Sequence, residues 1–224
     1  MKKTILMLAA VCSMTAVTAK DVKMTSPNGK LQVIVSDNNG NATYTVSLEG
    51  KTMMAASALG LKTNIGDFTQ KMTIEKAETK AIDKQYTMTR TKASASHYIA
   101  NQTVISLING NGYPMSITFN VSDNDVAYRY SLPRGKDNNP KCAVIYSEAS
   151  SFNFPEQTTT FLCPQSKTMV GWERTKPSYE EEYKADAPMT DRSAFGEGYT
   201  LPCLYKIGED GWVLVGETGV GSNY

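Results

Sequence analysis

The densest group of chemically capable side chains is an acidic run, Glu180-Glu181-Glu182, with a tyrosine on each side, Tyr179 and Tyr183. In an extended segment, Glu180 and Glu182 project to one side and Glu181 to the other. Carboxylates that converge on one side can bind a hard cation such as calcium, and neighbouring aromatic rings can stack on sugar rings. The same run also fits a solvated stretch of charge in a loop, which needs no ligand.

The other candidates for chemistry have structural interpretations. His97 is the only histidine, and no serine or cysteine in a nucleophile motif accompanies it, so we expect a structural role. The run Asp123-Asn124-Asp125 starts like a calcium loop but lacks the glycine and terminal glutamate of an EF-hand, which favours a hairpin turn. Arg129 lies between two tyrosines on an expected strand and points away from both. It pairs with a carboxylate inside the fold or binds a ligand, and we assign no catalytic residue.

The first 19 residues have the pattern of a secretory signal peptide. Two lysines follow Met1, an apolar run extends from Ile5 to Val17, and Val17-Thr18-Ala19 forms a small-residue cleavage site. The apolar run is too short to span a bilayer comfortably. A lipoprotein signal would need a small residue before Cys12, where a valine stands. We therefore expect cleavage after Ala19, a mature domain of residues 20–224, export to the periplasm and no membrane span.

The mature chain keeps three cysteines, Cys142, Cys163 and Cys203. Export permits either one disulfide or three buried thiols, and the absence of a C-x-x-C spacing argues against a thiolate metal site. Trp172 and Trp212 are expected to anchor the core.

Composition excludes several classes of protein. With 41% hydrophobic and 20% charged residues, the chain is an ordinary globular protein rather than a disordered, collagen-like or coiled-coil one. The 23 basic residues balance 22 acidic ones and form no cluster beyond the N-terminus, so we expect no nucleic-acid partner.

The elements that position these residues are predicted to be strands. Apolar residues alternate with polar ones in 31–35, 44–48 and 117–121, which is typical of half-buried antiparallel strands. Asn-Gly and Asp-Gly pairs stand between such runs, as tight hairpins require. The best helical window, Ile74–Lys84, lacks a continuous apolar stripe. We predict an all-β fold, a large antiparallel two-sheet β-sandwich, with a long irregular excursion at Lys176–Gly198.

Five segments then occur in a distinctive order: Thr25-Ser26-Pro27-Asn28-Gly29-Lys30-Leu31, Tyr44-Thr45-Val46, Ser57-Ala58-Leu59-Gly60-Leu61, Asp125-Val126-Ala127-Tyr128-Arg129-Tyr130 and Tyr179-Glu180-Glu181-Glu182-Tyr183. Together they resemble the N-terminal domain of glycoside hydrolase family 97. The resemblance covers the chain from about residue 22 to its end.

The resemblance implies an exported bacterial α-glycosidase acting on α-glucosides or α-galactosides. In this family the sandwich precedes a (β/α)8 catalytic barrel, which supplies the catalytic carboxylates, so this chain would be truncated before the barrel and inactive alone. Its partners would be that barrel and an α-linked oligosaccharide. The sandwich lends one glutamate to an active-site calcium, for which Glu182 is the best match and Glu180 the second.

One difference from the family stands at Asn101-Gln102, where an Asn-Glu pair is common; a glutamine cannot serve as an anionic ligand. Two other classes of function stay open: a free-standing carbohydrate-binding or adhesive sandwich, and a purely structural interaction module. The sequence does not choose between glucose and galactose, or between inversion and retention.

Overall fold

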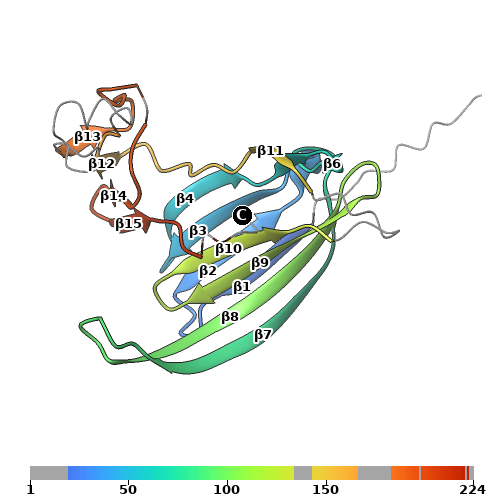
Figure 1. Ribbon diagram of the computed structural model, residues 1–224, viewed down its shortest axis with the longest axis horizontal. Helices are drawn as coiled ribbons and strands as arrows, with labels where there is room; N and C mark the ends of the chain where they lie inside the picture. The colour runs from blue at the N-terminus through green and yellow to red at the C-terminus, as the bar shows by residue number, and fades with distance from the viewer. Residues whose placement is uncertain (1–19, 134–142, 166–182, 197, 220, 222–224) are drawn as a thin grey trace, which may run out of the picture.

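The computed structural model describes residues 20–133, 143–165, 183–196, 198–219 and 221, and strands dominate these residues (Figure 1). The described part of the chain contains no α-helix and one short 3-10 turn, η1 (Asn38–Gly40). Accordingly, no helix in it has the length and apolar character needed to cross a membrane. The predicted all-β class is confirmed.

Two four-stranded antiparallel sheets form the main sandwich. The first sheet has the strand order β1-β2-β3-β4 and contains β1 (Asp21–Thr25), β2 (Leu31–Ser36), β3 (Thr43–Leu48) and β4 (Lys51–Ala58). The second has the order β10-β9-β8-β7 and contains β7 (Thr73–Thr87), β8 (Ala95–Ile108), β9 (Pro114–Ser122) and β10 (Val126–Ser131).

The hydrophobic core lies between these two sheets. Alternate residues of β2 are buried, as the period-two pattern predicts, and β9 buries Thr118 and Ser122 in addition to its alternate apolar residues. Val33 and Val35 from the first sheet and Ile117 and Phe119 from the second are completely buried. The two inner faces thus supply the apolar area that stabilises the fold.

A cluster of tyrosines closes one side of this core. The ring of Tyr128 packs against Tyr44, with centroids 5.5 Å apart, and against Tyr130, with centroids 5.9 Å apart. The hydroxyl of Tyr130 accepts a hydrogen bond from the Gly60 amide (2.9 Å) and shares another with the hydroxyl of Ser150 (2.6 Å). Burial raises the pKa of Tyr44 and of Tyr130 well above the usual range, so both side chains stay neutral and serve as hydrogen-bonding core residues.

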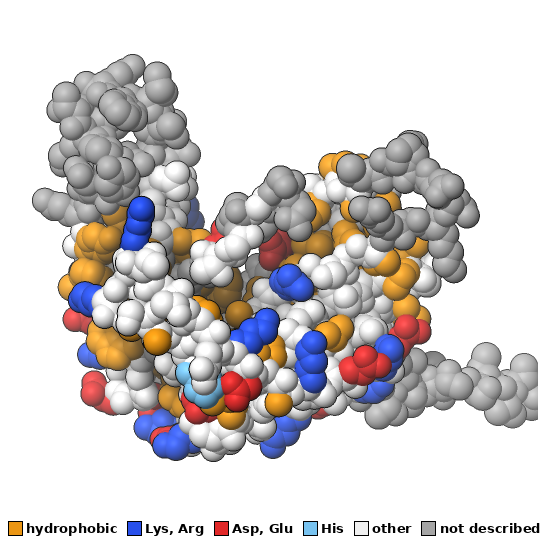
Figure 2. Space-filling view, turned by 60° about the horizontal axis from the view of Figure 1, so that its bottom comes forward, with side chains coloured by type: hydrophobic (Ala, Val, Ile, Leu, Met, Phe, Trp, Pro, Cys, Tyr) orange, Lys and Arg blue, Asp and Glu red, His pale blue; other side chains and the backbone are white. Residues whose placement is uncertain are grey.

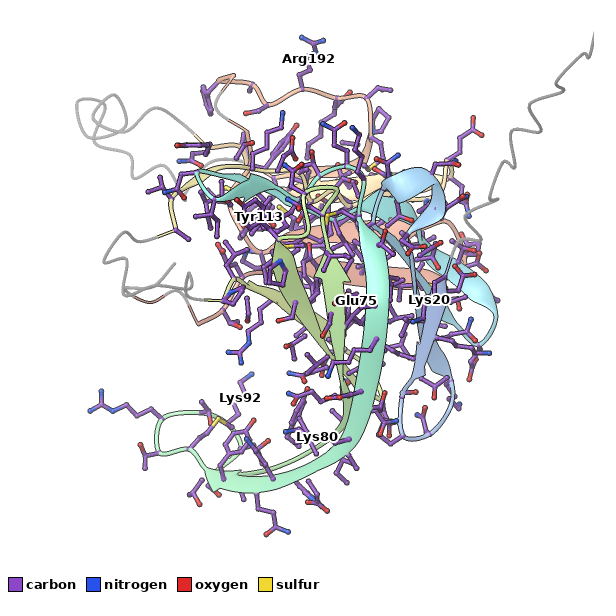
Figure 3. The ribbon with its side chains drawn as sticks, turned by 90° about the vertical axis from the view of Figure 1, so that its right-hand side faces the viewer. Lys20, Glu75, Lys80, Lys92, Tyr113 and Arg192 are labelled. Atoms are coloured by element: carbon purple, nitrogen blue, oxygen red, sulfur yellow. The ribbon has the colours of Figure 1, made fainter. Side chains whose placement is uncertain are left out.

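The hairpin of β7 and β8 extends beyond the sandwich as a curved arm (Figures 1 and 3). Strand β9 pairs with β8 only as far as Ala100, whereas β7 and β8 stay paired with each other out to Thr87 and Ala95. Nearly all of β7 after Ile74 is exposed. The window Ile74–Lys84 is therefore a strand, and it lacks the alternating pattern because no core covers either of its faces there.

Two smaller sheets complete the fold. One has the order β11-β5-β6 and contains β5 (Leu61–Thr63), β6 (Gly66–Asp67) and β11 (Ile145–Glu148). The other, which we call the small sheet, has the order β13-β12-β14-β15 and contains β12 (Thr158–Leu162), β13 (Lys184–Pro188), β14 (Cys203–Ile207) and β15 (Gly211–Val215). Part of the excursion predicted at Lys176–Gly198 is thus the strand β13.

Candidate functional site

The acidic run with the predicted calcium ligands Glu180 and Glu182 lies outside the described residues, and so do Trp172 and Cys142. Described strands stand on both sides of that segment. Leu162, at the end of β12, pairs with Lys184, at the start of β13. The ring of Tyr183, the residue after Glu182, stacks on the ring of Phe161 with centroids 4.8 Å apart and planes 18° apart. The acidic segment is therefore joined to the small sheet at both ends.

The described residues alone do not make a metal site. No group of three or more His, Cys, Asp or Glu side chains that could hold an ion occurs among them. On the small sheet, Asp186 accepts a hydrogen bond from Thr159 (3.2 Å) and Asp191 pairs with Lys184. The carboxylates of Glu180 and Glu182 have the oxygen donors that calcium prefers. A calcium ion here would need the carboxylates of Glu180 and Glu182 and further oxygen donors that the described residues do not supply.

The small sheet has an exposed apolar face, which we call its outer face. Strand pairing places Phe161, Leu204 and Leu214 in one row across β12, β14 and β15, and Lys206 and Trp212 in the next. Exposure is 40% for Phe161, 52% for Tyr183, 60% for Trp212 and 65% for Leu214. Large apolar side chains gathered on one face usually mark a surface that another protein or domain covers. The expectation that Trp212 anchors the core is wrong, because its side chain is exposed on this face, with the Lys206 ammonium 5.9 Å from the ring centroid.

The opposite face of the small sheet attaches it to the rest of the domain. Tyr205 stacks on Phe154 with centroids 4.1 Å apart, and Phe154 packs against the main core. An ion pair of 2.9 Å joins Lys51 on β4 to Asp210 in the β14–β15 turn. Because these contacts use the inner face, the outer face of the small sheet is left for another partner.

Two predicted candidates, His97 and the Asp123–Asp125 run, have structural roles, and a third, Arg129, lies on the surface. His97 pairs with Asp83 across the arm (2.6 Å), and both side chains are exposed; Figure 2 shows this histidine in pale blue beside red acidic side chains. The run Asp123-Asn124-Asp125 forms the turn between β9 and β10, where the Ser122 amide donates to the Asp125 carbonyl (3.0 Å). Arg129 points away from the core and is exposed, so the alternative of an ion pair inside the sandwich is wrong.

The Asn101-Gln102 pair is also engaged within the domain. Asn101 donates to the carbonyl of Thr25 (2.8 Å) and so ties the two main sheets together. Gln102, on the outer side of its sheet, donates to Asn120 on the neighbouring strand β9 (2.8 Å). Both amides therefore act as cross-strand supports.

Cys163 and Cys203 are buried in or beside the small sheet. Cys203 carries a free thiol that donates to the Thr200 carbonyl (3.4 Å), and burial raises the pKa of this thiol. This excludes a disulfide at Cys203. Cys163 is 1% exposed and packs as a small hydrophobic residue.

The model of the family "Glycosyl-hydrolase 97 N-terminal" matches residues 24–224. The chain belongs to this family. A crystal structure of a beta-arabinopyranosidase is 53% identical, with a TM-score of 0.84 over 90% of this chain. A family 97 enzyme from Pseudoalteromonas sp. strain K8, in complex with panose, is 21% identical with a TM-score of 0.68 over 83% of this chain, which supports the fold alone. A "Probable retaining alpha-galactosidase" of Streptomyces bingchenggensis (strain BCW-1) is 26% identical over 61% of this chain.

The chain spans only part of these relatives: 32% of the beta-arabinopyranosidase chain, 27% of the Pseudoalteromonas enzyme and 20% of the Streptomyces protein.

Most of the sequence motifs of this family 97 domain stabilise its fold. Ser57 is fully buried, and its hydroxyl accepts the Asn153 amide (2.9 Å). Gly60 has a φ of +151°, and a Cβ there would lie 2.5 Å from the Phe68 carbonyl oxygen, so only glycine fits. The tyrosines of the fourth motif are partly buried and pack against the core. The third and fourth motifs therefore identify the domain through its packing, whereas the fifth, Tyr179–Tyr183, lies outside the described residues except for Tyr183.

Sequence reasoning missed two features of the domain. One is the outer face of the small sheet. The other is Asp37, whose carboxylate binds the backbone amides of Lys20 and Ile74 although it stands in a turn-like sequence. In the sequence, only the apolar character of both faces of β15 indicated the outer face, and no pattern indicated the contacts of Asp37.

Proposed function

We propose that this chain is the N-terminal sandwich of an exported family 97 glycosidase that hydrolyses galacto-configured glycosides, and that it supports the catalytic barrel rather than carrying the catalytic carboxylates. The observation that carries the proposal is the 53% identity to the beta-arabinopyranosidase over 90% of this chain. Export rests on the signal-peptide pattern of residues 1–19.

The two named activities of relatives fit one stereochemical class of substrate. In the usual sugar series, a β-L-arabinopyranoside has the ring hydroxyls and anomeric bond of an α-D-galactoside and lacks only the hydroxymethyl group on C5. A beta-arabinopyranosidase and an alpha-galactosidase therefore cleave similarly oriented bonds. This favours galactose over glucose among the two substrate classes that the sequence left open.

The outer face of the small sheet supports a role as a partner of the barrel. A free-standing carbohydrate-binding or adhesive module would expose aromatic rings such as Trp212 but would be expected to keep its surface otherwise polar, whereas Leu214 is 65% exposed. We infer that this face packs against the rest of the enzyme. The described residues before and after the acidic segment belong to this sheet, and we propose that Glu180 and Glu182 contribute to the interface.

We assign Glu182, and secondarily Glu180, to a calcium ion that this interface would share. Calcium held by these carboxylates would offset negative charge that develops near the scissile bond. In an extended segment Glu181 would project to the other side, so it is not assigned to the ion.

The stereochemical assignment is tested on the longer enzyme that contains this chain. We expect it to hydrolyse aryl β-L-arabinopyranosides and aryl α-D-galactosides, with kcat/KM for an aryl α-D-glucoside lower by at least about 100-fold, because an axial hydroxyl on C4 that the site hydrogen-bonds is lost in glucose. Equal or greater kcat/KM on the glucoside would overturn the assignment.

The calcium ligand is tested by Glu182→Gln in the same longer enzyme. Loss of a direct ligand should weaken calcium binding by at least the roughly 10–100-fold that loss of a supporting residue costs, with a parallel fall in turnover that added calcium partly restores. Isothermal titration with Ca²⁺ on the EDTA-treated enzyme measures the affinity. Glu181→Gln is the matched control and should leave affinity unchanged; an equal loss in both variants, or in neither, would refute the assignment of Glu182.

A further inference from the structure

The carboxylate of Asp37 holds the first described residue of the domain. Its Oδ1 accepts a hydrogen bond from the backbone nitrogen of Lys20 (2.7 Å), and its Oδ2 accepts one from the amide of Ile74 at the start of β7 (2.8 Å). Asp37 is only 8% exposed. The ion pairs of the described residues include none to Asp37. A buried carboxylate therefore receives its described hydrogen bonds from backbone nitrogens.

The side chain of Lys20 is directed elsewhere. Its ammonium donates to the backbone carbonyl of Glu75 (2.7 Å), and Figure 3 labels Lys20, just before β1, and Glu75 on β7. The charged ammonium of Lys20 thus binds a neutral carbonyl group. The atom of Lys20 that meets the Asp37 carboxylate is the main-chain nitrogen.

The same nitrogen belongs to the bond that the sequence marks for cleavage. The small residues Val17-Thr18-Ala19 place the expected cut between Ala19 and Lys20, a pattern that is independent of the fold. Cleavage there converts the Lys20 nitrogen from a neutral amide with one N–H into a charged α-ammonium with three. We propose that removal of residues 1–19 creates an ion pair between this new α-ammonium and Asp37, so that processing itself locks the N-terminal strand of the sandwich.

The inference rests on the export that the proposed function includes. An ammonium is a stronger donor to a carboxylate than an amide, and partial burial weakens screening by salt. The location makes the lock useful, because β1 is an edge strand that pairs with β2 alone, and Val22 and Met24 of β1 belong to the core. The register is strict, since a cut one residue earlier would leave an amide at position 20 and a cut one residue later would remove this nitrogen.

The test compares two forms of the domain. One begins at Lys20 with no residue before it, and the other keeps residues 17–19 in front of Lys20. We expect the midpoint of thermal unfolding to be higher for the first form by about 2–4 °C, as for a single favourable interaction in a domain of this size. In the Asp37→Asn background this difference should vanish. Equal midpoints with Asp37 present, or a difference that persists in Asp37→Asn, would overturn the ion pair.

A matched control and a second readout keep the test decisive. Asp123 also accepts a backbone amide, that of Asn28 (2.9 Å), at an exposed site, so Asp123→Asn should leave the difference between the two forms intact. If Asp37→Asn fails to fold, acylation of the α-amine in the native chain decides: a paired ammonium should react at least about tenfold more slowly than the α-amine of a Lys-Asp-Val peptide. Equal acylation rates would contradict the pairing.

Identification of the natural N-terminus separates this inference from the proposed function. Mass spectrometry of the enzyme recovered from the periplasm should give Lys20 as the first residue. Another first residue would overturn processing-dependent pairing while leaving the glycosidase assignment intact. If the longer enzyme does not hydrolyse galacto-configured substrates, the glycosidase assignment is refuted, and the ion pair is unaffected.

Discussion

Replacing Phe119 with alanine is expected to lower the free energy of unfolding of the domain by about 3–5 kcal/mol, the largest effect of any single change considered. Phe119 is completely buried at the centre of β9. Its ring lies 6.2 Å from that of Tyr44 on the opposite sheet and 5.4 Å from that of Tyr128 on the neighbouring strand. Truncation therefore removes contacts on both sides of the sandwich and leaves a cavity that the two sheets cannot close.

Urea unfolding followed by fluorescence would measure this loss, with an unchanged dependence on urea showing that the unfolded state is not altered. Tyr86→Ala is the control, because Tyr86 is 49% exposed on the arm. It should change the free energy of unfolding by no more than about 0.5 kcal/mol. A loss at Phe119 below about 1.5 kcal/mol would mean that this core does not hold the two sheets together.

The main sandwich was predictable because one face of each strand is buried. In β2 the burial alternates from residue to residue, and the sequence alternates with it. In β7 the same reasoning stops working after Ile74, since the arm leaves the sandwich and solvent covers both of its faces. A strand with no buried face shows no alternation of apolar and polar residues. Neither the length of the arm nor its strand character could therefore be predicted.

The calcium site at the acidic run stays a prediction, because the run lies outside the described residues. Three adjacent glutamates indicate a hard-cation ligand by their chemistry, yet only the strand pairing of Leu162 with Lys184 shows that their segment is attached to the small sheet. Asp37 precedes Asn38-Asn39-Gly40, a sequence typical of a turn. Its contact with Lys20 joins residues 17 positions apart and has no local pattern in the sequence.

Trp212 shows why the outer face of the small sheet was missed. The run from Trp212 to Val215 is apolar at every position, so alternation cannot tell which face lies inward. In the structure Val213 and Val215 are half-buried, whereas Trp212 and Leu214 face outward. A strand that is apolar on both faces is typical of a sheet covered on both sides. The sequence of β15 thus fits the proposed docking of the outer face.

That cover can be tested by Leu214→Lys, studied both in the chain alone and in the longer enzyme. Leu214 is 65% exposed in this chain, so the change should alter its free energy of unfolding by no more than about 0.5 kcal/mol. If the outer face packs against the barrel, the same change forfeits the burial of a leucine, worth about 1.5–3 kcal/mol, and forces an ammonium into an apolar contact. In the longer enzyme we therefore expect the sandwich to unfold separately from the barrel in calorimetry.

Docking would be indicated by a larger effect of Leu214→Lys in the longer enzyme than in the chain alone, whatever the size of either effect. Ile99→Lys is the matched control, because Ile99 is an exposed aliphatic residue, 44% exposed, that lies on the arm instead of the small sheet. It should have little effect in either context.

If Leu214→Lys leaves the unfolding of the longer enzyme as cooperative as before, the outer face is a free surface. Its aromatic residues, Phe161, Tyr183 and Trp212, would then be better explained as a platform for sugar rings, since aromatic faces pack against the apolar faces of pyranoses.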